Sequence, residues 1–289
     1  MTPPVACVWQ NALVTGSRLA GRTLQTRVSL ATDLRRLGVV AGETLLVHSS
    51  LSSLGWVCGG SVAVVLALLD VVGPEGTLVV PAQTAAENRD PSRYRDPAVP
   101  DAWWPAIREN LPGYDPAVTP SRGVGAVAEQ VRTWPGALRS GHPQTSFAAV
   151  GAAADWLLAE HRLDSPLGEG SPLARLEEAG AQVLLLGVGF DKCTAFHLAE
   201  YRLPDPPRRS NGCAVVTPDG RQWVTYDGLA LDDSDFGALG SDFETHSAQV
   251  RRGRVGESTV RLFPVRAATA FALEWLVAKR GSVREVRLP

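Results

Sequence analysis

Apolar residues in the first part of the chain follow two different spacings. Over Arg27–Leu37 they recur every three or four positions before a glycine, which predicts a helix with a glycine stop. Two short apolar runs at residues 44–48 and 76–81 predict buried strands, and the apolar stretch between them, with Ser61 as its N-cap, predicts a helix. Strand, Ser/Gly-rich loop, helix and strand in this order are typical of a βαβ unit, so we expect a partly parallel sheet.

The rest of the chain continues with short predicted elements and one long irregular segment. We expect helices over residues 125–132, 153–161, 194–203 and 267–280, strands over 146–150 and 181–188, and a hairpin over 213–226. Residues 81–122 differ, because they hold eight of the 21 prolines together with several Trp and Tyr residues. Such a segment inside a compact domain is usually a functional loop or a cover rather than a core element.

The composition is that of an ordinary globular protein, with 289 residues of which 45% are hydrophobic and 20% charged. A net charge of −2 argues against a nucleic-acid-binding protein. The N-terminal sequence lacks the pattern of a signal peptide, and no apolar stretch approaches the ~20 residues that a membrane span needs. Cys7, Cys58, Cys193 and Cys213 are scattered, which is typical of reduced thiols. We therefore expect a cytoplasmic protein that binds neither nucleic acid nor membranes.

Common catalytic motifs are missing. The sequence contains no G-x-x-x-x-G-K-[ST] phosphate loop, no G-x-S-x-G nucleophile elbow and no H-E-x-x-H zinc helix. Gly123, Val124 and Gly125 resemble part of a dinucleotide fingerprint, but they follow Thr-Pro-Ser-Arg rather than a strand, so we disfavour a nucleotide site.

Serine and glycine residues surround the start of the first apolar helix. The run HSSLSSLG begins at His48, and Gly59 and Gly60 directly precede the helix. Hydroxyl groups and free N–H groups at a helix N-terminus bind phosphate oxygens well. A polar turn with a helix cap explains the same residues, and taken alone they favour this simpler explanation.

A histidine and two carboxylates follow the strand predicted at 181–188. Thr194 is placed to cap the next helix, which puts His197 in its first turn and Glu200 one turn on, on the same face. His197 can exchange a proton near neutral pH, and either Asp191 or Glu200 could fix its tautomer. A structural histidine is the commoner role for such a residue, and a metal site at His197 and Glu200 lacks a third ligand.

Two further features could contact a ligand. His142 lies on a Pro-containing loop, where it could bind a ligand or cap the loop. Residues 222–250 contain no Lys or Arg and carry Asp227, Asp232, Asp233, Asp235, Asp242 and Glu244. A solvated acidic face is the usual explanation for such a run, but a polycationic substrate would be attracted to it.

Six blocks of sequence, taken together, resemble the aminoglycoside 3-N-acetyltransferase family. They are VHSSLSSLGWVCGG (47–60), GPEGTLVVP (73–81), RSGHPQTSFAAVG (139–151), DSPLGEGSPLARL (164–176), VLLLGVGFDKCTAFHLAE (183–200) and DFGALGSDFE (235–244). Six blocks in the family's order are far more specific than any one of them. Cys193 departs from the family pattern GxDxNTxxHxxE, in which Asn often stands at its position.

The resemblance implies a single three-layer α/β/α domain with a central mixed sheet over residues 26–289, after a divergent segment 1–25. It implies transfer of an acetyl group from acetyl-coenzyme A to the 3-amino group of a 2-deoxystreptamine antibiotic, a polycationic aminoglycoside, and hence antibiotic resistance. No metal is implied, and the chain would act as a monomer or homodimer. The residues that would face coenzyme A are His48, Ser49, Ser50, Ser52, Gly59, Gly60, Thr119, Ser121 and Val124.

The resemblance also assigns the chemistry. His197, oriented by Asp191 or Glu200, would act as general base on the amine, which attacks the thioester directly without an acetyl-enzyme. The acceptor would be held by His142, Asp232, Asp233, Asp235 and Glu244. The alternatives are an acetyl-coenzyme A-dependent transferase of a non-antibiotic amine, a hydrolase, and a non-catalytic coenzyme A-binding module.

Overall fold

A mixed sheet of seven strands forms the centre of the computed structural model, which describes residues 21–95 and 97–285. Its strand order is β10-β11-β7-β2-β4-β6-β5. β2 is parallel to both of its neighbours, β4 and β7, whereas every other pairing is antiparallel. The strands are β2 (Thr44–Ser49), β4 (Thr77–Pro81), β5 (Leu138–Arg139), β6 (Phe147–Gly151), β7 (Gln182–Leu186), β10 (Arg251–Val255) and β11 (Ser258–Pro264).

The central strands are apolar on both faces, as expected for strands covered from both sides. On β2, Leu45 and Val47 enter one hydrophobic cluster and Leu46 enters the other. On β7, Leu184 belongs to the first cluster and Leu185 to the second. Successive side chains of a strand point to opposite faces, so this alternation divides the core into two layers.

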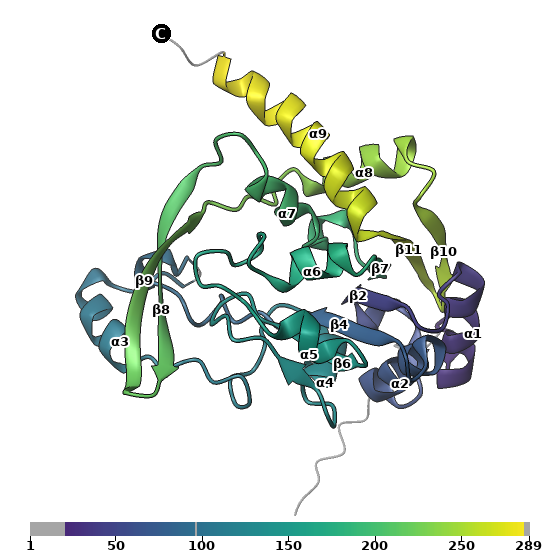
Figure 1. Cartoon of the computed structure of the whole chain (residues 1–289). Helices are drawn as coiled ribbons and strands as arrows, with labels where there is room; N and C mark the ends of the chain where they lie inside the picture. Colours follow the sequence, from purple (N-terminus) through teal and green to yellow (C-terminus); the bar gives the residue numbers. More distant parts are fainter. Residues whose placement is uncertain (1–20, 96, 286–289) are drawn as a thin grey trace, which may run out of the picture.

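Helices cover both faces of the sheet (Figure 1). One face carries α1 (Arg27–Leu37), α2 (Gly60–Val72) and α4 (Gly125–Arg132). The other carries α5 (Ala154–Leu158), α6 (Pro172–Glu178), α7 (Phe196–Tyr201), α8 (Phe236–His246) and α9 (Val265–Glu285). The expected three-layer α/β/α fold with a mixed central sheet is therefore confirmed.

A long hairpin stands apart from the sheet, formed by β8 (Arg208–Thr217) and β9 (Gly220–Leu229) (Figure 1). The Pro-rich segment 81–122 binds to this hairpin. Its Asn88 side chain exchanges two 2.8 Å hydrogen bonds with the backbone of Ala214, and Tyr114 forms a bridge with Val215. The segment also contains η3 (Pro91–Arg93), η4 (Asp101–Trp103) and α3 (Trp104–Asn110).

Shorter elements complete the described chain. β1 (Leu24–Gln25) pairs in parallel with β3 (Trp56–Val57), so the last residues of the expected divergent segment 1–25 join the fold. Two turns of 3-10 helix, η2 (Leu51–Ser53) and η5 (Phe190–Lys192), follow β2 and β7. Cys7 and the rest of residues 1–20 lie outside the described residues. No helix in the described ranges has the length and apolar character needed to cross a membrane.

Three predicted helix ends were wrong. Ser61 does not cap α2, because the N-cap is Gly59, at a φ of 86° that favours glycine, and Ser61 instead donates to Gln130. Thr194 does not cap α7, which begins only at Phe196. The final helix extends five residues past the predicted end at 280. Cap and stop signals are local, and contacts with the rest of the fold override them.

Candidate active site

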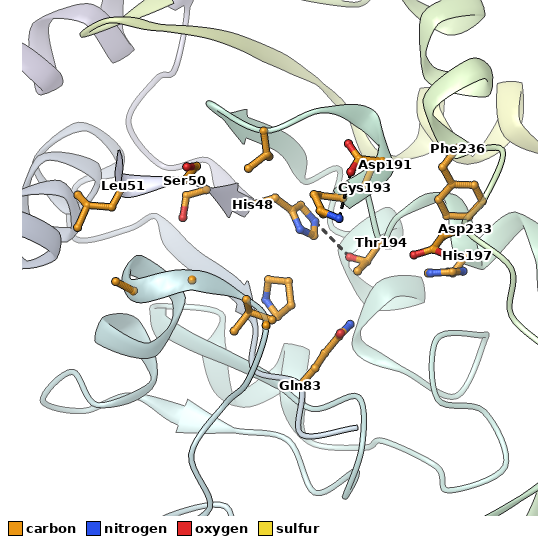
Figure 2. A pocket seen from close by; sticks show the side chains of 18 of the residues that line it. His48, Ser50, Leu51, Gln83, Asp191, Cys193, Thr194, His197, Asp233 and Phe236 are labelled. Atoms are coloured by element: carbon orange, nitrogen blue, oxygen red, sulfur yellow. Dashed lines mark hydrogen bonds and ion pairs between the residues drawn. The ribbon is translucent and has the colours of Figure 1, made fainter. Parts of the chain in front are cut away.

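A cleft of about 580 Å³ opens at the carboxyl ends of β2, β4 and β7. In open α/β sheets, ligands bind outside the carboxyl ends of parallel strands. The serine-rich turn after β2 forms one wall, and the residues from Val188 to His197 form another. Pro81 ends β4, Gln83 follows it (Figure 2), and residues at the N-terminus of α4 line the same cleft.

His197 and Glu200 form a short hydrogen bond on the wall of this cleft. The distance from His197 Nδ1 to Glu200 Oε2 is 2.5 Å, and the imidazole ring packs 4.8 Å from the ring of Phe236. Glu200 lies three positions after His197 on α7, which places both side chains on one helix face. Because a carboxylate accepts, Nδ1 carries a proton, and in the neutral imidazole Nε2 is therefore the nitrogen with the lone pair. The predicted alternative partner, Asp191, lies on the cleft but pairs with Lys192 at 3.0 Å.

The Glu200 carboxylate is buried, with 2% of the residue exposed, and is held from three directions. Its Oε2 accepts from His197, while Oε1 accepts from the Arg280 guanidinium at 2.6 Å and from the backbone N–H of Asp232 at 3.1 Å. Arg280 comes from α9, 80 residues further along the chain. Arg280 could not be predicted as part of the site, because no local spacing in the sequence connects it with His197.

A second histidine, His48 at the end of β2, also lines the cleft. Its Nε2 lies 3.2 Å from Thr194 Oγ1, and Figure 2 draws this hydrogen bond as a dashed line. Burial, assisted by the nearby His197, lowers the pKa of His48 to about 3, so this ring is neutral at physiological pH. Thr194 thus binds another side chain instead of capping α7.

Cys193, at the position where the family often has Asn, is buried beside Thr194. Burial raises the pKa of its thiol to about 12. The nucleophilic form of a cysteine is the thiolate, so this side chain is unreactive at neutral pH.

The residues predicted to face coenzyme A divide into two groups. Those lining the cleft are His48, Ser49, Ser50, Ser52 and Val124. Gly59, Gly60, Thr119 and Ser121 do not line it. Gly59 caps α2, the Thr119 hydroxyl accepts from the backbone N–H of Asp115, and Ser121 bonds to Glu129.

The residues predicted to hold the acceptor also separate. Asp233 is exposed and lines the cleft, and Asp232 is next to it. Two hydrogen bonds from Ser234 lower the pKa of Asp232, which keeps its carboxylate ionised. Asp235 is bound in a bidentate pair by Arg280, at 2.7 and 3.0 Å.

The other two predicted acceptor residues lie away from the cleft. Glu244 is paired with Arg261 through two hydrogen bonds of 2.9 Å. His142 is 1% exposed and accepts hydrogen bonds from the backbone N–H groups of Gln144 and Thr145. The structure therefore does not bring Glu244 or His142 to the predicted site. Among the residues that it describes, no three His, Cys, Asp or Glu side chains are grouped so as to hold a metal ion.

Comparisons with known proteins point to one family. The model of a family described as aminoglycoside 3-N-acetyltransferase matches residues 46–277. An aminoglycoside N(3')-acetyltransferase-like protein of Bacillus subtilis, YokD, is 44% identical over 88% of this chain and 93% of its own. Its crystal structure superposes with a TM-score of 0.87 at 42% identity, covering 90% of this chain and 96% of that one.

Two further relatives are named as acetyltransferases. Aminoglycoside N(3)-acetyltransferase VIII of Streptomyces fradiae is 38% identical over 89% of this chain and 93% of its own. The structure of AAC-IIIb with CoASH has a TM-score of 0.79 at 36% identity and covers 89% of this chain and 98% of that one.

Proposed function

The chain belongs to the aminoglycoside 3-N-acetyltransferase family, and from this premise we propose that it transfers an acetyl group from acetyl-coenzyme A to the 3-amino group of a 2-deoxystreptamine aminoglycoside. In the cell this reaction would confer resistance to the antibiotic. The observation that carries the proposal is the His197–Glu200 pair on the cleft wall. Glu200 binds Nδ1 of His197, and no hydrogen bond within the described ranges occupies the Nε2 of this ring.

His197 serves as the general base. An aminoglycoside amine is largely protonated at neutral pH and cannot attack a thioester until it loses a proton. His197 Nε2 accepts this proton, and Glu200 stabilises the imidazolium that results and keeps the proton-accepting nitrogen directed away from itself. Glu200, rather than Asp191, is the orienting carboxylate, because only Glu200 bonds to the ring.

Acetyl-coenzyme A supplies the activated acetyl group, and the cleft has features that suit it. Ser49, Ser50 and Ser52 present hydroxyl and backbone groups along one wall. Gly125 has a φ of 85°, and a Cβ added to it would lie 3.2 Å from the Ser49 carbonyl oxygen, so glycine keeps this wall open. These features and the CoASH-bound structure of AAC-IIIb support a coenzyme A site here.

Direct transfer requires no nucleophile from the protein. The buried Cys193 thiol, with its raised pKa, does not provide one. Negative charge that develops on the acetyl carbonyl oxygen needs hydrogen-bond donors, and the Thr194 hydroxyl on the cleft wall can donate to it when His48 Nε2–H donates to Thr194 Oγ1. We expect no acetyl-enzyme.

Asp233 and Asp232 hold the ammonium groups of the acceptor in this proposal. Asp235 acts only through Arg280, and Glu244 and His142 take no direct part. The acceptor side of the cleft thus has fewer carboxylates without an arginine partner than the acidic residues of segment 222–250 indicate.

This reduction favours a second candidate acceptor, an amine that is not an antibiotic. With Asp235 and Glu244 neutralised by arginines, the remaining charge suits an acceptor with few ammonium groups. The 44% identical YokD is itself named only acetyltransferase-like. The catalytic role of His197 is the same for either acceptor.

The test follows thiol release from acetyl-coenzyme A with a panel of 2-deoxystreptamine aminoglycosides and of simpler amines. We expect H197A to lose at least about 100-fold in rate. The matched control is H246A, which removes an exposed histidine whose Nδ1 bonds only to the Asp242 carbonyl oxygen. Mass and NMR analysis of the product locates the acetylated amine.

Each other outcome selects a different function. Release only with simple amines would support the second candidate. Thiol release without any amine would indicate a hydrolase, and binding without release would indicate a non-catalytic module. Equal activity of H197A and H246A would refute His197 as the base.

A further inference from the structure

Arg280 makes four hydrogen bonds next to the His197–Glu200 pair. Its Nε and Nη2 bind the two carboxylate oxygens of Asp235 at 3.0 and 2.7 Å, and Nη2 also donates to the Asp232 carbonyl oxygen at 2.7 Å. Its remaining nitrogen, Nη1, donates to Glu200 Oε1 at 2.6 Å. The planar guanidinium has a fixed geometry, so these contacts hold Glu200 and the 232–235 segment in one arrangement.

The two oxygens of Glu200 have separate partners. Oε2 is bonded to His197, and Oε1 is bonded to Arg280 and to the backbone N–H of Asp232. A rotation of this carboxylate about its terminal bond would break the contacts of both oxygens together. Glu200 is almost fully buried, and a buried carboxylate needs a nearby cation.

We propose that Arg280 is a positioning residue for the transfer reaction: it fixes the Glu200 carboxylate so that Oε2 faces His197 Nδ1, and it links this carboxylate to the 232–235 segment on the acceptor side. The proposal rests on the function proposed above. Burial acts to lower the pKa of Arg280, but its hydrogen bonds to Asp235 and Glu200 outweigh burial and raise it, so the guanidinium is always charged.

The alternative is that Arg280 only fastens α9 to the rest of the fold. The chain offers a matched arginine for this comparison. Arg202, at the end of α7, also binds two carboxylates, those of Glu169 and Glu177, and its side chain is 29% exposed against 24% for Arg280. Among the described residues, the Arg202 guanidinium makes no hydrogen bond to His197 or to Glu200; only the Arg202 backbone N–H reaches the Glu200 carbonyl oxygen, as the C-cap of α7.

The experiment compares R280A, R280K and R202A in thermal unfolding and in steady-state kinetics. We expect R280A and R202A to be destabilised alike, but only R280A to lose about 10- to 100-fold in kcat, because small displacements of a catalytic group have effects of this size. R280K keeps a positive charge near Glu200 but lacks the planar guanidinium, so it should recover part of the lost kcat. It also replaces R280A in the comparison if R280A does not fold. A kcat of R280A or R280K equal to that of R202A would overturn the proposal.

A double mutant separates positioning from a general loss of structure. If Arg280 acts through Glu200, then R280A should cost less than about threefold in kcat when added to E200Q, because the group that it positions is already neutral. Effects that multiply in full would show that Arg280 acts by another route and would overturn the inference.

A spectroscopic measurement tests the contact without activity. The 2.5 Å His197–Glu200 bond should give a far-downfield NMR signal for the Nδ1 proton, assigned by its loss in H197A. We expect the signal to vanish in R280A and to persist in R202A, and persistence in both would count against the proposal. Failure of the wild type with every amine would instead reject the proposed function, while this signal still reports on Arg280.

Discussion

Two neighbouring histidines away from the cleft predict that the folded state loses stability in mild acid. The rings of His142 and His161 lie 4.8 Å apart, tilted by 40°; His142 is buried and His161 is partly buried. His142 Nδ1 accepts two backbone N–H groups, so its proton is on Nε2, which donates to the Leu163 carbonyl oxygen at 3.3 Å. His161 Nε2 donates to the Pro166 carbonyl oxygen at 2.7 Å, and its Nδ1 accepts from Ser140.

A second proton disturbs the hydrogen bonds of both rings. On His142 Nδ1 it would face two N–H donors and break both bonds, and on His161 Nδ1 it would force the Ser140 hydroxyl to turn and accept instead of donate. Burial lowers the pKa of His142 to about 4, and burial together with His142 lowers that of His161 to about 3. In the unfolded chain both would titrate near pH 6.5.

These pKa values determine how the stability of the fold changes with pH. Because each folded pKa lies below its unfolded value, the unfolded chain binds protons more readily, and stability falls as the pH decreases below about 6.5. At pH 5 each histidine removes about 2 kcal/mol relative to pH 8. His48, with a pKa of about 3, adds a similar amount, so the total loss is about 6 kcal/mol, a large part of a typical folding free energy.

Urea unfolding followed by circular dichroism at pH 8 and pH 5 measures this loss. The variants H142N and H161Q keep one hydrogen-bonding group of each ring but do not titrate, so each should reduce the difference between the two pH values by about 2 kcal/mol. H246Q, at an exposed histidine, is the control and should leave the difference unchanged. The reasoning is refuted if wild type, H142N and H161Q all show the same pH dependence.

Two further predictions concern the cleft. In steady-state assays, D233N should raise KM for a polycationic acceptor several-fold. E244Q removes a carboxylate that is already paired with Arg261, so it should leave KM unchanged. Equal effects of the two variants would show that the acidic run acts only through its total charge. Iodoacetamide should modify the exposed Cys58 in the native protein but reach the buried Cys193 only after unfolding. Peptide mass spectrometry identifies the labelled cysteines, and labelling of Cys193 in the native protein would contradict its burial.

The parts of the site that depend on local spacing could be predicted from the sequence. The apolar runs at residues 44–48 and 76–81 form strands of the central sheet, because a strand that is buried on both faces is apolar at every position. The three-residue spacing of His197 and Glu200 placed them on one helix face, and the structure joins them. The same spacing could not decide between Glu200 and Asp191, since both lie close to His197 in the sequence.

The parts that depend on distant contacts could not be predicted. Thr194 has the sequence position of a helix cap, but His48, 146 residues earlier, binds its hydroxyl. Arg280 is separated from Glu200 by 80 residues, and its position on an amphipathic helix gave no sign of a catalytic partner. Only the folded sheet and its covering helices bring these residues to one end of β2 and β7.

The acidic run shows most clearly why a charge pattern does not determine a binding site. Asp233, Asp235 and Glu244 have the same charge and lie within twelve residues of one another, yet only Asp233 is unpaired among the described residues. Arginines from outside the run, Arg280 and Arg261, neutralise the other two carboxylates. Under the proposed function, acceptor selection depends on which carboxylates the arginines leave free, and a relative without Arg280 would differ both in the charge of its acceptor site and in the support of the proposed base.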